Sequence, residues 1–268
     1  MTGLRVNGTA VATVVDDPDL DTRLAPRPYL HPVRTLSGTV VTGELPEDHP
    51  WHLGVSVTCQ DVDGVNLWGG RTYVRGEGYV WRDDHGRIVA DDRTELPDGY
   101  TQRLSWQDGA GRVVLREERS VRARAAASGW ELSLGYALSA PTVKEVHLGS
   151  PATNGRTGGA GYGGFFWRAT GGEAVAFTST GDEPHGSDAD WLAVTVGDAY
   201  TLVFRGLAGR DRWFVRLEEY VGVCQALAWE QPLRIVPGTP LIRDIRVLVA
   251  DGVLSREAIA AHVAEAAI

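Results

Sequence analysis

The chain has little cysteine, no excess of positive charge and no long apolar run, and each of these features narrows its range of functions. Cys59 and Cys224 are its only cysteines among 268 residues. Both lie in apolar segments, which predicts reduced, buried thiols, although the sequence leaves open a disulfide between them or a reactive thiol. The formal net charge of −9 argues against nucleic acid or an anionic membrane surface as a partner, but not against a small basic pocket.

The chain also lacks the signals that direct a protein into or across a membrane. No uninterrupted apolar run approaches the roughly 18 residues of a membrane span. Residues 1–5 lead into an ordinary strand pattern, with no basic segment followed by an apolar one. We therefore expect a cytoplasmic protein that binds no membrane, and the sequence leaves open whether it forms a homo-oligomer.

Strand-like segments and turn residues recur along the whole chain, which has 33 glycines and 13 prolines. Asn7-Gly8, between two alternating segments, is typical of a two-residue hairpin turn. Only the C-terminus looks helical, because Ser255 can cap a helix whose Ile259 and Val263 share one face. Further strands are predicted at residues 36–43, 53–60, 72–80, 102–107, 113–121, 130–138, 191–196, 200–204, 213–217, 221–229 and 241–249.

This pattern of many strands without alternating helices indicates an antiparallel all-β architecture. The number of candidate strands favours a large two-sheet sandwich with a short C-terminal helix over a small barrel. No internal repeat, heptad or shift in composition marks a boundary, so we predict one domain over residues 1–268. A chain of this length can remove roughly 70–75% of its unfolded surface from water.

Several familiar catalytic signatures are absent from the sequence. There is no Gly-x-Ser-x-Gly elbow, no Cys-x-x-Cys pair and no phosphate-binding Gly-Lys-Ser/Thr loop. Adjacent carboxylates occur at Asp83-Asp84 and Glu218-Glu219. Neighbours on a strand point to opposite faces, so neither is the facing pair that a glycosidase needs.

The densest cluster of chemically active residues is 47–54, Glu-Asp-His-Pro-Trp-His-Leu-Gly, which contains two of the seven histidines. His49 and His52 can exchange protons near neutral pH, with Asp48 orienting one imidazole. A regular strand would send the two rings to opposite faces, so they converge only if the chain kinks at Pro50. A divalent metal bound by His49 and His52 is an alternative without a visible third ligand, and a purely structural role is another.

A second cluster lies in residues 29–34, where Tyr29, His31 and Arg34 follow one another at nearly alternate positions. Such spacing can line one surface of an extended segment. The Arg34 guanidinium could there bind a carboxylate or phosphate with two hydrogen bonds. A structural loop tied down by Arg34 is the competing interpretation.

A third cluster spans residues 66–73. Trp68 and Tyr73 could stack on the apolar face of a sugar while Asn66 and Arg71 bond its hydroxyl groups, although tryptophan is equally normal in a sandwich core.

The segment 150–164 is unusually rich in glycine, which favours close approach of the backbone to a ligand, or a lid. Tyr162 at its end is a candidate ligand contact. Arg168 follows three aromatic residues, where it is either stacked or ion-paired, and is a further candidate for binding the ligand.

Several of these motifs together resemble one bacterial family. The chain resembles the proteins labelled methane oxygenase PmoA, or PmoA-like, over nearly its whole length. It departs from many members in having Leu53 where they carry a polar His or Arg, which weakens any role for a third polar group there. The motifs that carry the resemblance are Pro28–Val33, Asp48-His49-Pro50-Trp51-His52-x-Gly54, Val65–Gly69, Gly161–Phe165, and a late stretch from Trp213–Arg216 through Pro237-Gly238 to Ala250–Gly252.

The resemblance implies a large β-supersandwich similar in architecture to sugar mutarotases. Members of that family tend to be encoded near sugar oxidoreductases and sugar isomerase-like proteins. A role in carbohydrate catabolism is therefore implied by association rather than by mechanism.

Three hypotheses for the function follow from the sequence. The first is a carbohydrate-active enzyme that epimerises, cleaves by β-elimination or hydrolyses a sugar or keto-sugar glycoside, with His49, His52 and Asp48 as the catalytic residues. The second is a non-catalytic sugar-binding protein or accessory subunit of a sugar oxidoreductase, and the third is the metal-dependent oxygenase that the family label suggests. The residues expected to contact the carbohydrate are Tyr29, His31, Arg34, Asn66, Trp68, Arg71, Tyr73, Tyr162 and Arg168.

Overall fold

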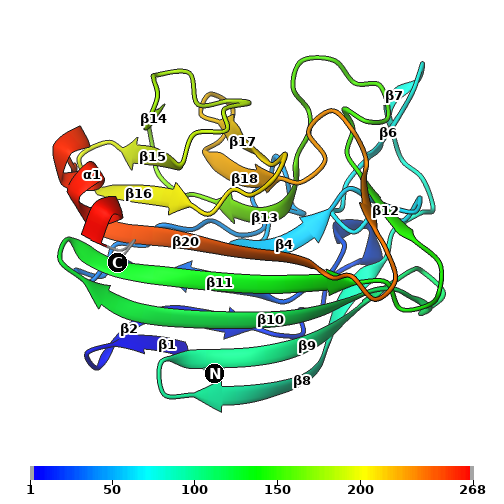
Figure 1. The fold of residues 1–268 in the computed structure, drawn as a ribbon, viewed down its shortest axis with the longest axis horizontal. Coiled ribbons are helices and arrows are strands. Elements are labelled where there is room, and N and C mark those ends of the chain that lie inside the picture. Colours follow the sequence, from blue (N-terminus) through cyan, green and yellow to red (C-terminus); the bar gives the residue numbers. More distant parts are fainter. Residues whose placement is uncertain (1–2, 266–268) are drawn as a thin grey trace.

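The computed structural model describes residues 3–265 and consists of two large stacked β-sheets and one short C-terminal helix (Figure 1). Both large sheets are antiparallel throughout, with seven strands in one and eight in the other. A three-stranded sheet and a small hairpin lie at one end, on the right of Figure 1. The predicted all-β two-sheet sandwich with a C-terminal helix is confirmed.

The strand order differs from the sequence order in both large sheets. Across the seven-stranded sheet it is β1 (Gly3–Val6), β2 (Thr9–Val15), β3 (Tyr29–Val33), β4 (Val55–Cys59), β13 (Gly163–Arg168), β18 (Gly222–Ala226) and β17 (Arg212–Arg216). Across the eight-stranded sheet it is β14 (Ala174–Thr178), β15 (Trp191–Val196), β16 (Tyr200–Arg205), β20 (Leu241–Asp251), β11 (Gly129–Ser139), β10 (Val113–Ala126), β9 (Gly99–Gln107) and β8 (Arg87–Leu96).

The smaller sheets belong to the loop-rich end of the sandwich. The three-stranded sheet has the order β19 (Leu233–Ile235), β12 (Val146–Gly149) and β5 (Asp61–Val62), and the hairpin pairs β6 (Thr72–Val74) with β7 (Gly78–Val80). A single 3₁₀ turn, η1 (Thr22–Leu24), precedes β3.

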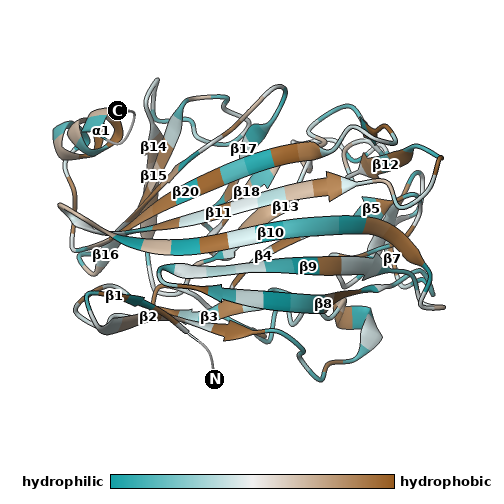
Figure 2. Cartoon of the chain, turned by 60° about the horizontal axis from the view of Figure 1, so that its bottom comes forward, coloured by the Kyte–Doolittle hydropathy of each residue, from teal (hydrophilic) through white to brown (hydrophobic). Residues whose placement is uncertain are grey.

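The main core fills the space between the two large sheets, because alternate side chains of each strand point into it. Phe165 and Trp167 of β13 meet Phe204 of β16 across this space, with ring centroids 6.4 and 5.7 Å apart. Strand β10 alternates buried and exposed residues along most of its length. Figure 2 shows the corresponding mixture of hydrophilic and hydrophobic segments along β8, β9 and β10.

The C-terminal helix α1 (Arg256–Glu265) covers part of the outer face of the eight-stranded sheet (Figure 1). Ile259 is fully buried there against Trp191 and Val203, and Val263 packs at the edge of the same cluster. The Ser255 Oγ accepts a hydrogen bond of 3.2 Å from the Ala258 N–H, as its predicted capping role requires. No helix within residues 3–265 is long and apolar enough to cross a lipid bilayer.

The predicted turns and strands hold with a few exceptions. Asn7 and Gly8 have positive φ values of 50° and 84°, as expected for the hairpin turn between β1 and β2. Residues 36–43 are not a strand, because Gly38 at φ 100° and a bond from the Thr39 N–H to the Thr35 Oγ1 close a tight turn. Residues 72–80 form a hairpin of two short strands rather than one strand.

Strand β8 was missed from sequence because most of its residues are polar and exposed at the sheet edge, so apolar alternation is weak. The two cysteines are free and buried, as predicted. Strand β13 separates their strands, and the thiols face different layers: Cys59 the main core and Cys224 an apolar cluster on the other face of the sheet. A disulfide between them is therefore sterically excluded in this fold.

A buried carboxylate connects helix α1 to the eight-stranded sheet. The Glu131 side chain is almost fully buried and forms ion pairs with Arg124 and Arg205, and the His262 Nε2 of α1 lies 3.5 Å from its Oε2. Burial by itself would raise the pKa of Glu131. The interactions with His262, Arg205 and Arg124 outweigh burial and lower its pKa to about 2.

We predict that Glu131 makes stability depend on acid pH. Because its pKa falls on folding, it contributes stability above the ordinary pKa of 4.5 that is lost as the pH falls towards 2. Replacement of Glu131 by Gln should lower the free energy of unfolding at pH 7 by about 3 kcal/mol and flatten its dependence on pH below 5. Urea unfolding from pH 7 to pH 2.5 tests this, with the exposed Glu118→Gln as control. Parallel pH profiles for wild type and Glu131→Gln would contradict it.

Candidate functional site

The centre of the seven-stranded sheet is buried on both faces, which sets the position of the site. All residues of β4 and β18 are buried, and so are the first five of β13. One face meets the main core, and the other carries a smaller apolar cluster that includes Trp68, Phe166 and Phe214. Loops surround this second cluster and leave above it a cavity of about 510 Å³, within the size range of small-molecule sites.

The walls of this cavity combine aromatic rings with charged groups. Its aromatic residues are Trp51, Trp68, Tyr79, Trp81, Tyr162, Phe214 and Tyr220. Its charged residues are Glu47, Asp48, Arg71, Arg156, Arg216 and Glu219, and the imidazoles of His49 and His52 lie among them.

A tight turn over residues 46–52 brings the two histidines together. The His49 N–H bonds to the Pro46 carbonyl at 3.1 Å, and the His52 N–H bonds to the His49 carbonyl at 2.9 Å. The two imidazole rings consequently stack, with centroids 4.7 Å apart and an interplanar angle of 14°. The convergence expected from a kink at Pro50 therefore occurs.

The outer imidazole forms a carboxylate–histidine pair. The His49 Nδ1 lies 2.7 Å from the Asp48 Oδ2, so its proton is donated to the carboxylate and the Nε2 lone pair remains available. Burial alone would raise the pKa of Asp48, but the hydrogen bond from His49 and the charge of Arg168 outweigh it and lower that pKa. Asp48 is therefore a carboxylate that orients His49, not a proton donor.

The inner imidazole is neutral and fixed in one tautomer. His52 is buried, and the Arg168 Nη1 donates a hydrogen bond of 3.0 Å to its Nδ1. Because a guanidinium can only donate, the proton of His52 must be on its Nε2. Burial, followed by the charges of His49, Arg168 and Arg27, lowers the pKa of His52 well below its usual value.

Aromatic rings form a continuous floor from the histidines to the far side of the cavity. The ring centroid of Trp68 lies 5.9 Å from that of His52 and 4.8 Å from that of Tyr162. Tyr162 in turn lies 5.5 Å from Phe214. Trp68 and Phe214 are buried in this packing and support the cavity, whereas Trp81 in its wall is 51% exposed and presents a ring that could pack against the C–H face of a sugar.

A buried guanidinium holds the two tryptophan-bearing loops in place. Arg27 is fully buried and donates hydrogen bonds to the carbonyls of Ala25, Trp51 and Trp68 and to the Ser56 hydroxyl, at 2.9 to 3.2 Å. Burial lowers its pKa to about 9, so it stays charged at neutral pH. Within residues 3–265 it has no carboxylate partner, and the carbonyl dipoles take that role.

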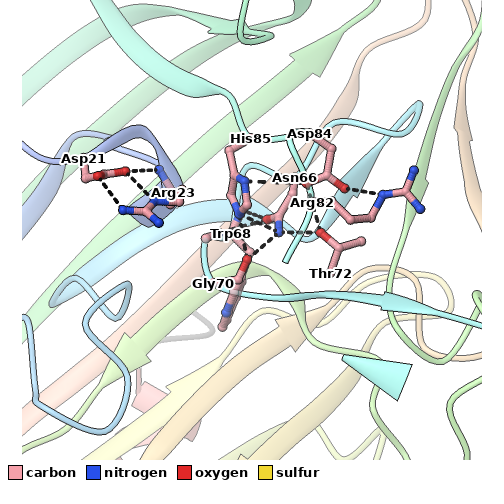
Figure 3. Close-up of polar contacts among 10 residues, drawn as sticks. Asp21, Arg23, Asn66, Trp68, Gly70, Thr72, Arg82, Asp84 and His85 are labelled. Atoms are coloured by element: carbon pink, nitrogen blue, oxygen red, sulfur yellow. Dashed lines mark hydrogen bonds and ion pairs between the residues drawn. The ribbon is translucent and has the colours of Figure 1, made fainter. Parts of the chain in front are cut away.

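Asn66 is not among the residues that line the cavity, and it holds the Trp68 loop through hydrogen bonds (Figure 3). It is buried, and its Oδ1 accepts hydrogen bonds from the N–H groups of Trp68 and Gly69 at 3.0 and 2.9 Å. Its Nδ2 donates to the Thr72 Oγ1 at 2.9 Å, beside the His85 ring that bonds to the Gly70 carbonyl. The hydrogen-bonding capacity of the amide is thus used within the protein.

Two glycines in this loop allow Trp51 to lie directly on the backbone. Gly69 and Gly70 have φ values of 96° and 71°, and a Cβ at either position would lie 2.6 Å from an atom of Trp51. A side chain at either glycine would displace Trp51 from its position in the cavity wall.

The structure gathers some of the predicted ligand-binding residues and separates others. Trp68, Arg71 and Tyr162 line the cavity, and Arg168 supports it through His52. Besides Asn66, four predicted contacts lie elsewhere. The Tyr29 hydroxyl bonds to Glu44, His31 contacts Thr42 and Glu44, Arg34 bonds to the Gly38 carbonyl, and Tyr73 lines a different depression beside Arg75.

The donor atoms of the two stacked histidines do not fit a divalent metal. Their nearly parallel planes direct the lone pairs side by side rather than towards one point. The Nδ1 of His52 accepts a hydrogen bond from the positive Arg168, so the ring carries its proton on Nε2 and presents no lone pair to a metal. In the described part of the chain, no three His, Cys, Asp or Glu side chains are grouped as metal ligands. The chemistry proposed below accordingly uses side chains alone.

Several cavity residues were not predicted from the sequence. Trp51, Tyr79, Trp81, Arg156, Arg216, Glu219 and Tyr220 all line the cavity. Arg216 had a usable signal, since it follows Trp213 and Val215 of β17 with the alternation that places it opposite the core. The sequence did not show which of the two outer sheet faces would be covered by loops.

Comparison with known proteins assigns the chain to a family without an assigned function. Residues 2–264 match the model described as "Family of unknown function (DUF6807)", and the chain belongs to this family. No curated protein matches the chain. Among solved structures it is similar to the GH36 alpha-galactosidase AgaA from Geobacillus stearothermophilus, with a TM-score of 0.36 and 8% sequence identity, over 67% of this chain and 29% of that enzyme. The chain thus spans less than a third of the length of that enzyme.

The family match corrects one expectation. Assignment to the PmoA-like proteins was wrong, because the matching family is DUF6807. The motifs behind that resemblance have local structural causes in this chain. Gly54 has a φ of 38°, and a Cβ there would lie 2.1 Å from the Leu30 carbonyl oxygen. A methane-oxygenase activity therefore has no support from the family.

We predict that His52 stays uncharged in mildly acidic solution. Its lowered pKa means that protonation begins only well below pH 6.5, and the Nε2–H tautomer should persist until then. Nitrogen-15 NMR of the imidazoles between pH 8 and pH 5.5 measures both, with the exposed His147 as an internal reference. A His52 titration midpoint near 6.5, or an Nδ1–H tautomer, would contradict the assignment.

We also predict that Asn66 is essential to the shape of the cavity. Asn66→Ala leaves two buried N–H groups without an acceptor and should cost about 2–4 kcal/mol of unfolding free energy. The near-ultraviolet circular dichroism should change as Trp68 moves. Thr72→Val removes only one partner of the amide and is the control, expected to cost about 1 kcal/mol. Equal effects of both substitutions would show that the two N–H bonds are unimportant.

Proposed function

We propose that the protein is a carbohydrate-active enzyme that transfers a proton at the carbon next to the carbonyl group of a keto-sugar or its glycoside. The observation that carries the proposal is the Asp48–His49 pair stacked on the neutral His52 at one end of an aromatic-floored cavity. The cavity volume and the aromatic rings of its wall, Trp51 and Trp81 among them, support a sugar-sized ligand.

In this proposal His49 is the general base. Its Nε2 takes the proton from the carbon next to the carbonyl, and Asp48 stabilises the imidazolium that results. The electron pair of the broken C–H bond moves to the carbonyl oxygen, which becomes an enolate. The reaction then divides. Protonation of the enolate by a water molecule on the opposite face gives an epimer, and His49 releases its proton to solvent. Departure of a substituent from the next carbon, protonated by the His49 imidazolium, instead completes a β-elimination.

His52 has a separate part in the same step. His52 is neutral and carries its proton on Nε2. It can therefore donate a hydrogen bond from this N–H to the oxygen of the forming enolate. Arg168 fixes that tautomer and adds a positive charge next to the forming oxyanion. Glycoside hydrolysis by two carboxyl groups is less well supported, since the lowered pKa of Asp48 makes it a poor acid.

The test is exchange of the substrate proton with solvent. Methyl glycosides oxidised at C2, C3 or C4 are incubated in D₂O, and deuterium incorporation and product formation are followed by proton NMR. We expect His49→Ala to slow exchange by about 10²–10⁴-fold and Asp48→Asn by about tenfold or more.

The matched control is His147→Ala. His147 also contacts an aspartate, Asp63 at 3.1 Å, but it is exposed on β12 and does not line the cavity. Exchange at the wild-type rate in His49→Ala would refute the assignment of the base. Saturable binding of these sugars by the wild type without any exchange would instead identify a sugar-binding protein.

A further inference from the structure

We propose that the natural ligand of the cavity carries a negative charge, a carboxylate or a phosphate group on the sugar, which Arg71, Arg156 and Arg216 bind. That the ligand is a sugar rests on the proposed function. Its negative charge is inferred separately, from the arginines of the cavity. An arginine fork matches the geometry of both anionic groups and binds either with paired hydrogen bonds.

The three cavity arginines lack the carboxylate partners that most other arginines of the protein have. In residues 3–265, Arg216 bonds only to His185 and to its neighbour's carbonyl, Arg156 bonds only to the Tyr79 hydroxyl, and Arg71 forms no side-chain hydrogen bond. This occurs in a protein with 35 acidic and 26 basic residues, where acidic partners are in excess. The cavity lining has as many carboxylates as guanidiniums, but these guanidiniums pair with none of them, so their hydrogen-bond donors remain free for an anionic ligand.

Aromatic rings hold two of these guanidiniums in position without using all their donors. The Arg156 Cζ lies 4.8 Å from the Tyr79 ring centroid, and the Arg216 Cζ lies 4.4 Å from that of Phe214. The Tyr79 hydroxyl is 2.9 Å from that of Tyr162, whose ring packs on Phe214. Both arginines are partly buried, and their guanidiniums pack on one connected group of aromatic rings.

Trp68 connects the aromatic group that carries Arg156 and Arg216 to the ring of His52. Trp68 contacts Tyr162 on one side and His52 on the other, with ring centroid distances of 4.8 and 5.9 Å. The arginines and the histidines line the same cavity of about 510 Å³, so a single sugar can contact both. Its anionic group would anchor the ring so that the carbon to be deprotonated faces His49. Glu47 and Glu219, the other acidic side chains of the wall, are exposed.

The test compares probes that differ only in charge. Calorimetric titrations of the full-length protein use glucose, galactose and mannose, their uronates, and their 6-phosphates. We expect a uronate or a 6-phosphate to bind at least tenfold more tightly than its neutral parent at 20 mM NaCl. This advantage should shrink several-fold at 500 mM NaCl, because salt screens the interaction. The uronate and phosphate arms show which anion the arginines prefer.

Substitutions then locate the charge preference. Arg216→Gln and Arg156→Gln should each abolish most of the tenfold advantage, measured within each variant as the ratio of its dissociation constants for the neutral and the charged probe. Arg71 is exposed. If the other two variants are unstable, the charge preference is measured in Arg71→Gln instead. Arg116→Gln removes an equal charge from the exposed face of β10 and should change nothing.

The outcomes separate this inference from the proposed function. Neutral and charged probes that bind equally well would overturn the charge preference and leave a sugar-binding cavity. A charge preference that survives in all three cavity variants would overturn the role of these arginines. No binding of any probe to the wild type would overturn both proposals.

Discussion

The central strands of the seven-stranded sheet must bury both of their faces, and the rest of the site depends on this constraint. Strands β4, β13 and β18 supply one layer of side chains to the main core and a second layer to the opposite face. That second layer cannot remain exposed, because its rings would form a large apolar patch in water. The loops that cover it bring the histidines, tyrosines and arginines of the cavity with them.

The charges around the histidines follow from the same burial. Arg27 is held by carbonyl dipoles and Arg168 by Asp48 and a stacked Tyr220 ring, so positive charge surrounds His52 from two directions. A buried imidazole in such a field stays neutral, whereas the outer His49 keeps its carboxylate partner. Burial and the neighbouring guanidiniums together lower the pKa of His52, whereas His49, three residues earlier, is hydrogen-bonded to a carboxylate.

The fold could be predicted from sequence more completely than the site. Alternation and turn residues identify the hairpin at Asn7-Gly8 and the capped C-terminal helix, because both depend on local preferences. The pairing of His49 with His52 was predicted only as a consequence of a kink at Pro50. Asn66 and Tyr29 were expected to face a ligand and instead bond within the protein, since sequence shows which side chains are polar but not which partners the fold supplies. Arg216 and Tyr220 reach the cavity through strand order, which pairs β17 with β18 and β18 with β13 across long stretches of chain.

Seven of the nine tryptophans, all except Trp191 and Trp229, fall into two groups as a result of this layered burial. Trp106, Trp130, Trp167 and Trp213 are fully enclosed in the main core and shielded from the solvent. Trp51, Trp68 and Trp81 line the cavity, and Trp51 lies 5.3 Å from the His49 ring, centroid to centroid. Emission from the first group depends on the packing of the sandwich core, and emission from the second on the surroundings of the cavity wall. Intrinsic fluorescence therefore combines contributions from the core and from the cavity, and replacing Trp51 or Trp81 by Phe would separate the two.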